Sequence, residues 1–317
     1  MSKKTDTQKI GFFIKQLRER RGLTQGAFAK ELSTSQSAVA RMEKGEQNFS
    51  TELLAKISEV LEHKIISINN SIDFEIVGGK KLEGTIKTNF SKNGSVGLLC
   101  ASLLNRGKTT LHGIARIEEV YRVIEILESI GVSIKWIDQN SVEIVQPKTL
   151  NLQNMNVESA IKTRSIVMLM GPLIHLFKEF SLPHAQGCKL GKRTVSAHMY
   201  ALEELGVNIK TTKKSYDVSY KKLKSNDIVM YEAGDTACEN AIMAASKIKG
   251  VTTIECASGN YMVQEMCFFL QTLGVEITGI GTGTLTIKGV PEINKNIEYS
   301  NSEDPIESMM FISLAIA

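Results

Sequence analysis

Apolar residues near the start of the chain recur with the spacing of amphipathic helices. A first helix is expected to end near Gly22. Thr24 and Ser35 have the side chains of N-cap residues, which predicts helices that begin at Gln25 and Gln36. A fourth helix should follow the third. The inward-facing residues of these helices are Ile14, Leu17, Phe28, Ala29, Leu32, Val39, Met42, Leu53, Leu54, Ile57 and Leu61.

The second and third helices are joined by a tight turn, which is the arrangement of a helix-turn-helix. The stretches "LRERRGLTQ", "AFAKEL" and "SQSAVARMEKG" resemble the Cro-type phage-repressor (XRE) family over about 55 residues. That resemblance implies base reading from the start of the third helix. It also implies a phosphate contact at the start of the second, where the helix dipole favours an anion. The positions concerned are Gln36, Ser37, Ala40 and Arg41 for bases and Gln25 for phosphate.

The same resemblance implies that Arg18 and Glu43 form a structural ion pair. Duplex DNA is then the expected partner. A homodimer is a further expectation, because two half-sites raise the affinity. The alternative left open is a helical protein-interaction module that has lost DNA binding.

Positive charge is concentrated in the same region. Residues 1–66 hold 12 Lys and Arg against 8 Asp and Glu, and the net charge of the whole chain is +4. The entire excess therefore lies in the first fifth of the chain, which favours an anionic partner there. The helical period is lost towards residue 73. We place a helix-turn-helix domain at 1–66 and a linker at 67–73.

The rest of the chain contains an internal repeat. The segments "LESIGVSI" (127–134), "LEELGVNI" (202–209) and "LQTLGVEI" (270–277) each combine a helix end, a glycine turn and a strand. An apolar helix and a β-rich piece precede each copy, and a further strand follows it. Three such units predict an α/β lobe with apolar helices inside and small sheets outside. The pair "GTGT" (281–284) is then a hairpin turn and not a phosphate loop.

Composition excludes several classes of protein. No apolar run reaches about 18 residues, so no membrane span is expected, and the polar N-terminus does not match a secretory signal. The odd number of cysteines, without pair spacing, favours reduced thiols in a cytoplasm over disulfides or a zinc site. The histidines are scattered, and we expect no metal and no cofactor. The cysteines are Cys100, Cys188, Cys238, Cys256 and Cys267.

Residues 74–317 resemble the N-terminal part of the enolpyruvyl transferases, above all the UDP-N-acetylglucosamine 1-carboxyvinyltransferases. The matching stretches are "GGKKLEGTIKTNFSKNGS", "ASLLNRGKTTLHGI", "RSIVMLMGPL", "GCKLGKR" and "ALEELGVNI". The resemblance implies two lobes, each an inside-out arrangement of three α/β units, with substrates bound between them. It also implies transfer of the enolpyruvyl group of phosphoenolpyruvate to UDP-N-acetylglucosamine or a related sugar nucleotide, in peptidoglycan precursor synthesis.

The predicted fold class is therefore α+β multidomain, with a small all-α domain followed by one inside-out α/β lobe. We place that lobe at 74–303, and residues 74–90 would pack into a second lobe in the family. Residues 304–317 are expected to begin that second lobe, which is otherwise missing. The final apolar helix has no cap, so we expect a truncated chain that is inactive alone.

Cys188 is the most distinctive candidate for chemistry. It lies in a glycine-flanked loop with Lys189, Lys192 and Arg193 close in sequence. Neighbouring cations stabilise a thiolate, which makes the thiol reactive. The family resemblance implies that Cys188 is a general acid towards phosphoenolpyruvate, whereas the residues alone are more typical of a surface thiol.

Further site positions rest on the same resemblance. Phosphoenolpyruvate carries a phosphate and a carboxylate, and fixed cations suit both. Without the resemblance, Arg164 and Asp304 would be ordinary helix-start residues. The implied catalytic positions are Cys188, Lys92, Arg193 and Asp304, and the implied substrate-binding positions are Asn93, Arg164, Ser196 and His198.

Three segments depart from the family pattern. "TVSAH" (194–198) has Ser196 in place of a carboxylate that recognises uracil. "AGDTACEN" (233–240) puts Asp235, which would repel a diphosphate, into a phosphate-binding loop. "SEDP" (302–305) has Ser-Glu in place of Pro-Thr before Asp304.

Two functions stay open. The retained cations, Cys188 and Asp304 favour a carboxyvinyltransferase homologue with a fused, sequence-specific DNA-binding domain. The departures favour a transcriptional regulator whose retired enzyme lobe senses a sugar nucleotide or phosphoenolpyruvate.

Overall fold

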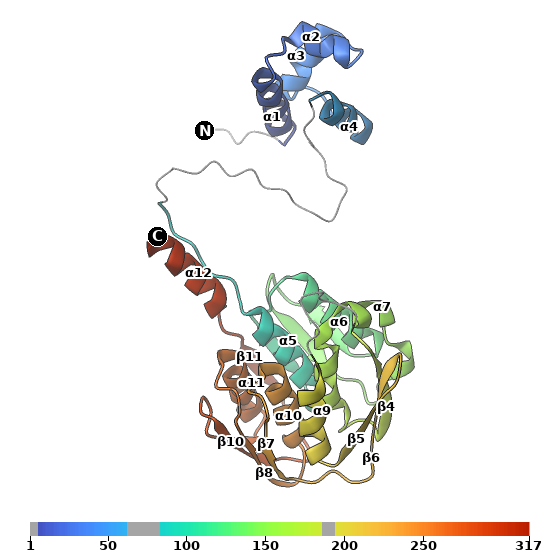
Figure 1. Cartoon of the computed structure of the whole chain (residues 1–317), viewed down its shortest axis with the longest axis vertical. Helices are drawn as coiled ribbons and strands as arrows, with labels where there is room; N and C mark the ends of the chain where they lie inside the picture. Colours follow the sequence, from blue (N-terminus) through green and yellow to red (C-terminus); the bar gives the residue numbers. More distant parts are fainter. Residues whose placement is uncertain (1–5, 62–82, 186–193, 317) are drawn as a thin grey trace. The chain divides into compact units, whose positions relative to one another are not determined.

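The computed structural model describes residues 6–61, 83–185 and 194–316 (Figure 1). The chain divides into two compact units, Met1–Lys81 and Leu82–Ala317. The first unit is helical throughout its described residues, and the second contains helices and strands. The predicted linker at 67–73 lies outside the described residues, so the domain boundaries at 66 and 74 stay predictions.

Four helices make up the described part of the first unit. They are α1 (Asp6–Arg20), α2 (Gln25–Glu31), α3 (Gln36–Lys44) and α4 (Thr51–Val60). Both predicted caps are confirmed: the Thr24 side chain accepts a hydrogen bond from the Ala27 N–H, and Ser35 accepts one from the Ala38 N–H. Gly45 ends α3 with a φ of 70°, a left-handed conformation that glycine adopts without strain.

The predicted inward faces of these helices form one hydrophobic core. Leu53 packs against it while only partly buried. Helices α1 and α3 lie close together at Gly11, where a Cβ would lie 2.8 Å from the Gly45 nitrogen. The buried members are Ile14, Leu17, Phe28, Ala29, Leu32, Val39, Met42, Leu54, Ile57 and Leu61.

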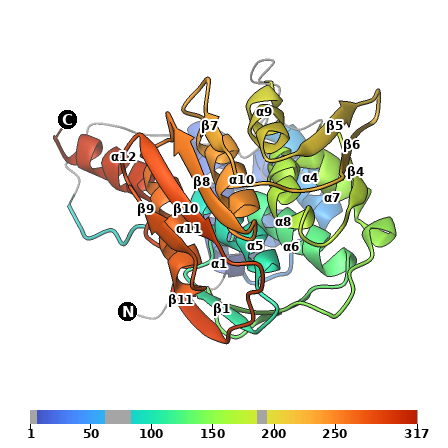
Figure 2. The same cartoon turned by 90° about the horizontal axis from the view of Figure 1, so that it is seen from below.

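The second unit is built from three repeats that share the order helix, strand, helix and two further strands, and the second and third repeats carry additional elements before it (Figures 1 and 2). The first has α5 (Lys92–Ala101), 3-10 helix η1 (Ser102–Leu104), β1 (Thr109–His112), α6 (Glu118–Ser129), β2 (Ser133–Trp136) and β3 (Val142–Val145). The second has η2 (Leu152–Asn154), α7 (Val157–Lys162), η3 (Arg164–Leu169), α8 (Met170–Leu173), β4 (Glu179–Pro183), α9 (Ser196–Glu204), β5 (Val207–Thr211) and β6 (Ser215–Tyr220). The third has β7 (Asp227–Val229), α10 (Asp235–Ala245), β8 (Gly250–Glu255), α11 (Tyr261–Thr272), β9 (Glu276–Thr278) and β10 (Thr284–Gly289).

Each repeat contributes its own small sheet. The strand orders are β11-β1-β3-β2, β4-β6-β5 and β7-β8-β10-β9. The strands of each repeat pair antiparallel, except that β7 pairs in parallel with β8 in the third repeat. Strand β11 (Ile297–Ser300) follows the third repeat but pairs in parallel with β1 of the first, with Ile297 opposite Thr109. This pairing ties the end of the lobe to its beginning.

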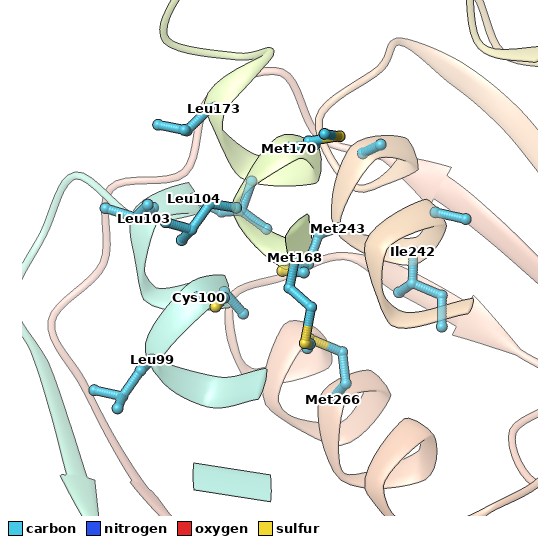
Figure 3. Packing of buried hydrophobic residues seen from close by; sticks show 14 of the residues in the cluster. Leu99, Cys100, Leu103, Leu104, Met168, Met170, Leu173, Ile242, Met243 and Met266 are labelled. Carbon is cyan, nitrogen blue, oxygen red and sulfur yellow. The ribbon is translucent and has the colours of Figure 1, made fainter. Parts of the chain in front are cut away.

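Apolar helices form the interior of the lobe. Residues 94–101 of α5 and 237–245 of α10 are buried on all sides, which is typical of a central helix. Figure 3 shows side chains from the three repeats converging there. The predicted inside-out arrangement, with helices inside and sheets outside, is confirmed. The labelled core residues are Leu99, Cys100, Leu103, Leu104, Met168, Met170, Leu173, Ile242, Met243 and Met266.

The predicted turn at 281–284 is also confirmed. It joins β9 to β10, which pair antiparallel with Ile277 opposite Ile287. Gly279 and Gly281 have φ values of 79°, so the turn uses the left-handed conformation that glycine permits. These glycines therefore allow the backbone to form the hairpin turn between β9 and β10.

The last element is α12 (Pro305–Ile316). None of its described residues is buried, although most of them are apolar. Ile306, Met309 and Met310 are each more than half exposed. Its apolar surface is therefore uncovered in this chain.

Candidate ligand pocket and DNA-binding helix

The predicted base-reading residues lie together on the first turns of α3. Gln36, Ser37 and Arg41 are exposed and Ala40 is half-buried. Their spacing places them on one face of the helix, opposite the buried Val39 and Met42. The Ser37 hydroxyl lies 2.9 Å from that of the cap residue Ser35, whereas Gln36 and Arg41 extend into solvent. This face can enter a groove of DNA.

The Arg18–Glu43 ion pair is confirmed and holds α1 against α3. Both residues are buried, with exposed fractions of 6% and 7%. Arg18 donates from Nε and Nη2 to the two carboxylate oxygens of Glu43 and from Nη1 to the Leu23 carbonyl. The hydrogen bond to Glu43 raises the pKa of Arg18. A bidentate pair with a third bond to a backbone carbonyl fixes the geometry of the turn before α2.

Gln25 takes part in the same network. Its Nε2 donates to Glu43 Oε2 over 2.9 Å, and the residue is half-buried. This bond orients the Gln25 side chain at the first position of α2. The predicted phosphate contact of Gln25 stays a prediction.

The second unit contains a cavity of about 850 Å³ to which all three repeats contribute. Four predicted site residues line it together, although they lie far apart in sequence: Lys92, Asn93, Arg164 and His198. The other lining residues are Glu119, Ser165, Val167, Met168, Thr194, Glu232, Ala233, Gly234, Asp235, Thr236 and Met262. We call this cavity the inter-repeat pocket.

Lys92 stands at the first position of α5 and forms an ion pair with Glu119. Its Nζ lies 2.7 Å from Glu119 Oε2. Burial acts to raise the pKa of Glu119, but the hydrogen bonds from Lys92, Ser165 and Thr163 outweigh it and hold the pKa below its usual value. Glu119 is therefore an ionised carboxylate that positions the Lys92 ammonium at the edge of the pocket. The sequence offered no signal for this partner, because the pairing spans 27 residues.

His198 lies in the pocket wall with an exposed fraction of 3%. The Asn240 side chain is oriented by the Gly171 N–H, which donates to its Oδ1, so its Nδ2 faces His198 Nδ1 at 3.3 Å. Nδ1 must then accept, and Nε2 carries the proton and faces the Thr236 hydroxyl. Burial, with the charge of Arg164, lowers the pKa of His198 to about 4. His198 is thus a neutral, positioned imidazole at pH 7.

Arg164 begins η3 and reaches across the pocket. Its Nη2 donates to the Thr194 carbonyl over 3.2 Å, and Arg164 is among the residues that line the pocket. Ser196 lies beside this contact but is not among the lining residues. Its N–H donates to the Thr194 hydroxyl, and its own hydroxyl pairs with the same group. The Ser196 side chain therefore interacts with Thr194 at the first position of α9.

Two carboxylates near the start of α10 also line the pocket. Asp235 is the first residue of α10 and accepts hydrogen bonds from Ser258 Oγ at 2.5 Å and from Asn260 Nδ2 at 3.1 Å. Glu232 lies beside it, with Oε1 only 3.2 Å from where a Cβ on Gly234 would be. The pocket lining therefore combines the cations Lys92 and Arg164 with the carboxylates Glu119, Glu232 and Asp235.

Asp304 has a local structural role at the start of α12. Its Oδ1 accepts a hydrogen bond from the Ile306 N–H, and its carbonyl accepts one from the Ser308 N–H, so it begins α12. It is not among the residues that line the inter-repeat pocket. Its predicted catalytic role stays a prediction. Cys188 and Arg193 lie outside the described residues, so their predicted roles also stay predictions.

No group of three or more His, Cys, Asp or Glu side chains within the described residues could hold a metal ion. No described helix combines the length and apolar character that a membrane crossing requires. The described cysteines Cys100, Cys238, Cys256 and Cys267 are all free thiols.

Comparison with known proteins matches both units. Residues 76–317 fit the family of EPSP synthase (3-phosphoshikimate 1-carboxyvinyltransferase), and residues 14–63 fit a helix-turn-helix family. A UDP-N-acetylglucosamine 1-carboxyvinyltransferase of Helicobacter pylori is 34% identical over 230 residues, which cover 72% of this chain and 54% of the relative. The enzyme of that name from Bradyrhizobium diazoefficiens is 32% identical over 244 residues, with 77% and 56% covered.

Solved structures show the same fold. The enolpyruvyl transferase NikO from Streptomyces tendae superposes with a TM-score of 0.62 at 18% identity, covering 74% of this chain and 55% of that one. An EPSP synthase from Acinetobacter baumannii superposes with a TM-score of 0.59 at 16% identity. The chain spans about half the length of the relatives it matches. It belongs to the enolpyruvyl transferase (EPSP synthase) family and carries an N-terminal helix-turn-helix domain.

Proposed function

We propose that this chain binds duplex DNA through α3 and a small phosphorylated carboxylate, of the phosphoenolpyruvate class, in the inter-repeat pocket. The observation that carries the proposal is the convergence of Lys92, Asn93, Arg164 and His198 on one cavity from different repeats. The first unit supplies an exposed polar helix face on a core held by the Arg18–Glu43 pair.

The cations that line the pocket suit an anion with two acidic groups. Arg164 uses one donor for the Thr194 carbonyl, so its remaining donors can bind a carboxylate or phosphate in bidentate fashion. Lys92 is a compact second cation and is held in place by Glu119. The predicted positions Cys188 and Arg193 would add a thiol and a further cation from the loop before Thr194.

Two interpretations of the lobe are open. We propose first that it is a carboxyvinyltransferase homologue. In the relatives the corresponding reaction is named for transfer of a carboxyvinyl group to UDP-N-acetylglucosamine. For this chain we expect no turnover by itself. Asp304 is engaged at the start of α12, and about half of the relatives' length is not in this chain.

The second reading is a regulator whose lobe senses the ligand and no longer transforms it. The carboxylates Glu232 and Asp235 in the pocket favour a regulator, since their negative charges would repel a second anion. In that case phosphoenolpyruvate would change the affinity of the chain for DNA. If the lobe is instead a carboxyvinyltransferase homologue, ligand binding in the pocket and DNA binding by α3 would be independent of each other.

Calorimetric titration of phosphoenolpyruvate into the 317-residue chain tests the proposal. We expect saturable binding at pH 7, weakened at least about tenfold by Arg164→Ala, because a charged hydrogen bond of about 1.5–3 kcal/mol is lost. Arg106→Ala removes an arginine that lies outside the pocket lining and should leave the affinity unchanged. Equal affinities for the parent and Arg164→Ala would contradict the anion site.

A further inference from the structure

We propose that Glu119 is a positioning residue for both cations of the inter-repeat pocket. It holds Lys92 directly, and through the hydroxyls of the two residues that flank Arg164 it also holds the segment that presents this arginine. The inference rests on the proposed binding of a phosphorylated carboxylate in the pocket. It adds the residue that keeps the two cations in place for such a ligand.

The two oxygens of the Glu119 carboxylate contact different segments of the chain. Oε2 pairs with Lys92 Nζ at 2.7 Å. Oε1 accepts hydrogen bonds from the hydroxyls of Ser165, over 2.5 Å, and Thr163, over 3.3 Å. Thr163 and Ser165 are the sequence neighbours of Arg164. One carboxylate therefore joins the start of α5, which carries the first cation, to the start of η3, which carries the second.

These contacts cross from the first repeat to the second. Glu119 belongs to α6, whereas residues 163–165 lie between α7 and α8. A second bond follows the same path, because Arg122, one turn further along α6, donates from Nη1 to the Lys162 carbonyl over 3.0 Å. Helix α6 thus holds the chain immediately before and after Arg164, and this restricts where the guanidinium can lie.

The negative charge of Glu119 is compatible with an anion site. Glu119 is the second residue of α6, where the partial positive charge of the helix N-terminus stabilises a carboxylate. The Lys92 ammonium at 2.7 Å offsets this charge, so a ligand anion meets an ion pair and not an isolated carboxylate. What the pair contributes is geometry: a long, flexible lysine side chain is ordered before the ligand arrives, which lowers the entropic cost of binding.

Calorimetric titration of phosphoenolpyruvate into the full chain tests this role in Glu119→Ala, Arg164→Ala and the double variant. We expect Glu119→Ala to bind about tenfold more weakly, because Lys92 and residues 163–165 lose their common partner. In the Arg164→Ala background the same change should cost at most about threefold, since part of its effect passes through Arg164. A merely structural role would give the same factor in both backgrounds.

Two further variants sharpen the result. Glu119→Gln keeps the shape and an oxygen that Ser165 and Thr163 can reach, but it loses the charge that pairs with Lys92, so its affinity should fall between those of the parent and Glu119→Ala. Glu203→Ala removes an exposed glutamate of α9 outside the pocket lining and should bind as the parent does. Equal or tighter binding by Glu119→Ala overturns the proposal, and so does an equal factor in both backgrounds.

Hydrogen exchange of the ligand-free chain separates this inference from the proposed function. Peptides that cover residues 163–169 should exchange at least about threefold faster in Glu119→Ala and at the parent rate in Glu203→Ala. If phosphoenolpyruvate binds to none of the chains, the proposed function fails and the exchange rates alone decide on Glu119. Unchanged exchange at 163–169 in Glu119→Ala would overturn its positioning role.

Discussion

Glu239 is a buried acid one helical turn beyond Asp235 in α10. Its exposed fraction is 1%, and its Oε1 has no hydrogen-bond partner within the described part of the chain. The space for it depends on Gly97 of α5, where a Cβ would lie 2.9 Å from Oε1. Burial, with the charge of Asp235 added, raises the pKa of Glu239 well above 4.5. The folded chain therefore keeps this carboxyl protonated at pH values where the unfolded chain has lost the proton.

That difference predicts a pH-dependent stability. Above pH 4.5 the unfolded state releases the proton and the folded state does not, so stability falls as the pH rises towards the folded pKa. Glu239→Gln should remove a slope of up to about 1.4 kcal/mol per pH unit. Urea unfolding of the parent and the variant between about pH 5 and pH 8 measures it. Glu203→Gln, an exposed control, should keep the parent slope. A Glu239→Gln chain with the parent's slope would show that Glu239 is ionised when folded.

At the scale of elements, the first unit depends on the close crossing of α1 and α3. A Cβ on Gly11 would lie 2.8 Å from the Gly45 nitrogen and 3.0 Å from the Glu43 carbonyl oxygen, both backbone atoms that cannot turn aside. Gly11→Ala should therefore destabilise the first unit by about 1–3 kcal/mol, the usual range for overpacking. Hydrogen exchange of peptides from α1 and α3 would show faster exchange.

Gly26 in α2 provides the matched control. A Cβ there would have no neighbour closer than 4.0 Å, and alanine is the better helix former. Gly26→Ala should leave exchange in α1 and α3 unchanged or slow it slightly. Faster exchange in Gly26→Ala than in Gly11→Ala would contradict the crossing described above.

For the whole molecule, the features that could be predicted from the sequence are those with a local cause. Thr24 and Ser35 cap helices because each reaches a backbone N–H three residues away. The repeat was visible because each copy carries the same helix, glycine turn and strand. The pairing of β11 with β1 could not be predicted from the sequence, since it joins residues 188 apart and depends on closure of the lobe.

The candidate site follows the same division. The family resemblance identified Lys92, Arg164 and His198, and the structure brings them to one pocket. Their partners Glu119 and Asn240 come from other helices and have no signal in the local sequence. His198 is kept neutral mainly by burial, and the partners beside it include Thr236 and Asn240 of the third repeat.

The central claim is that one chain joins a DNA-reading helix to an enolpyruvyl-transferase lobe. Fluorescence anisotropy of the full chain on a duplex selected from a random pool, measured across a series of salt concentrations, tests it most directly. We expect the affinity to fall steeply with salt, because phosphate contacts release counterions. Gln36→Ala should cost about 1–3 kcal/mol on the selected duplex and little on random DNA, whereas Gln153→Ala in the lobe should change neither. Binding that ignores both salt and Gln36 would contradict the claim.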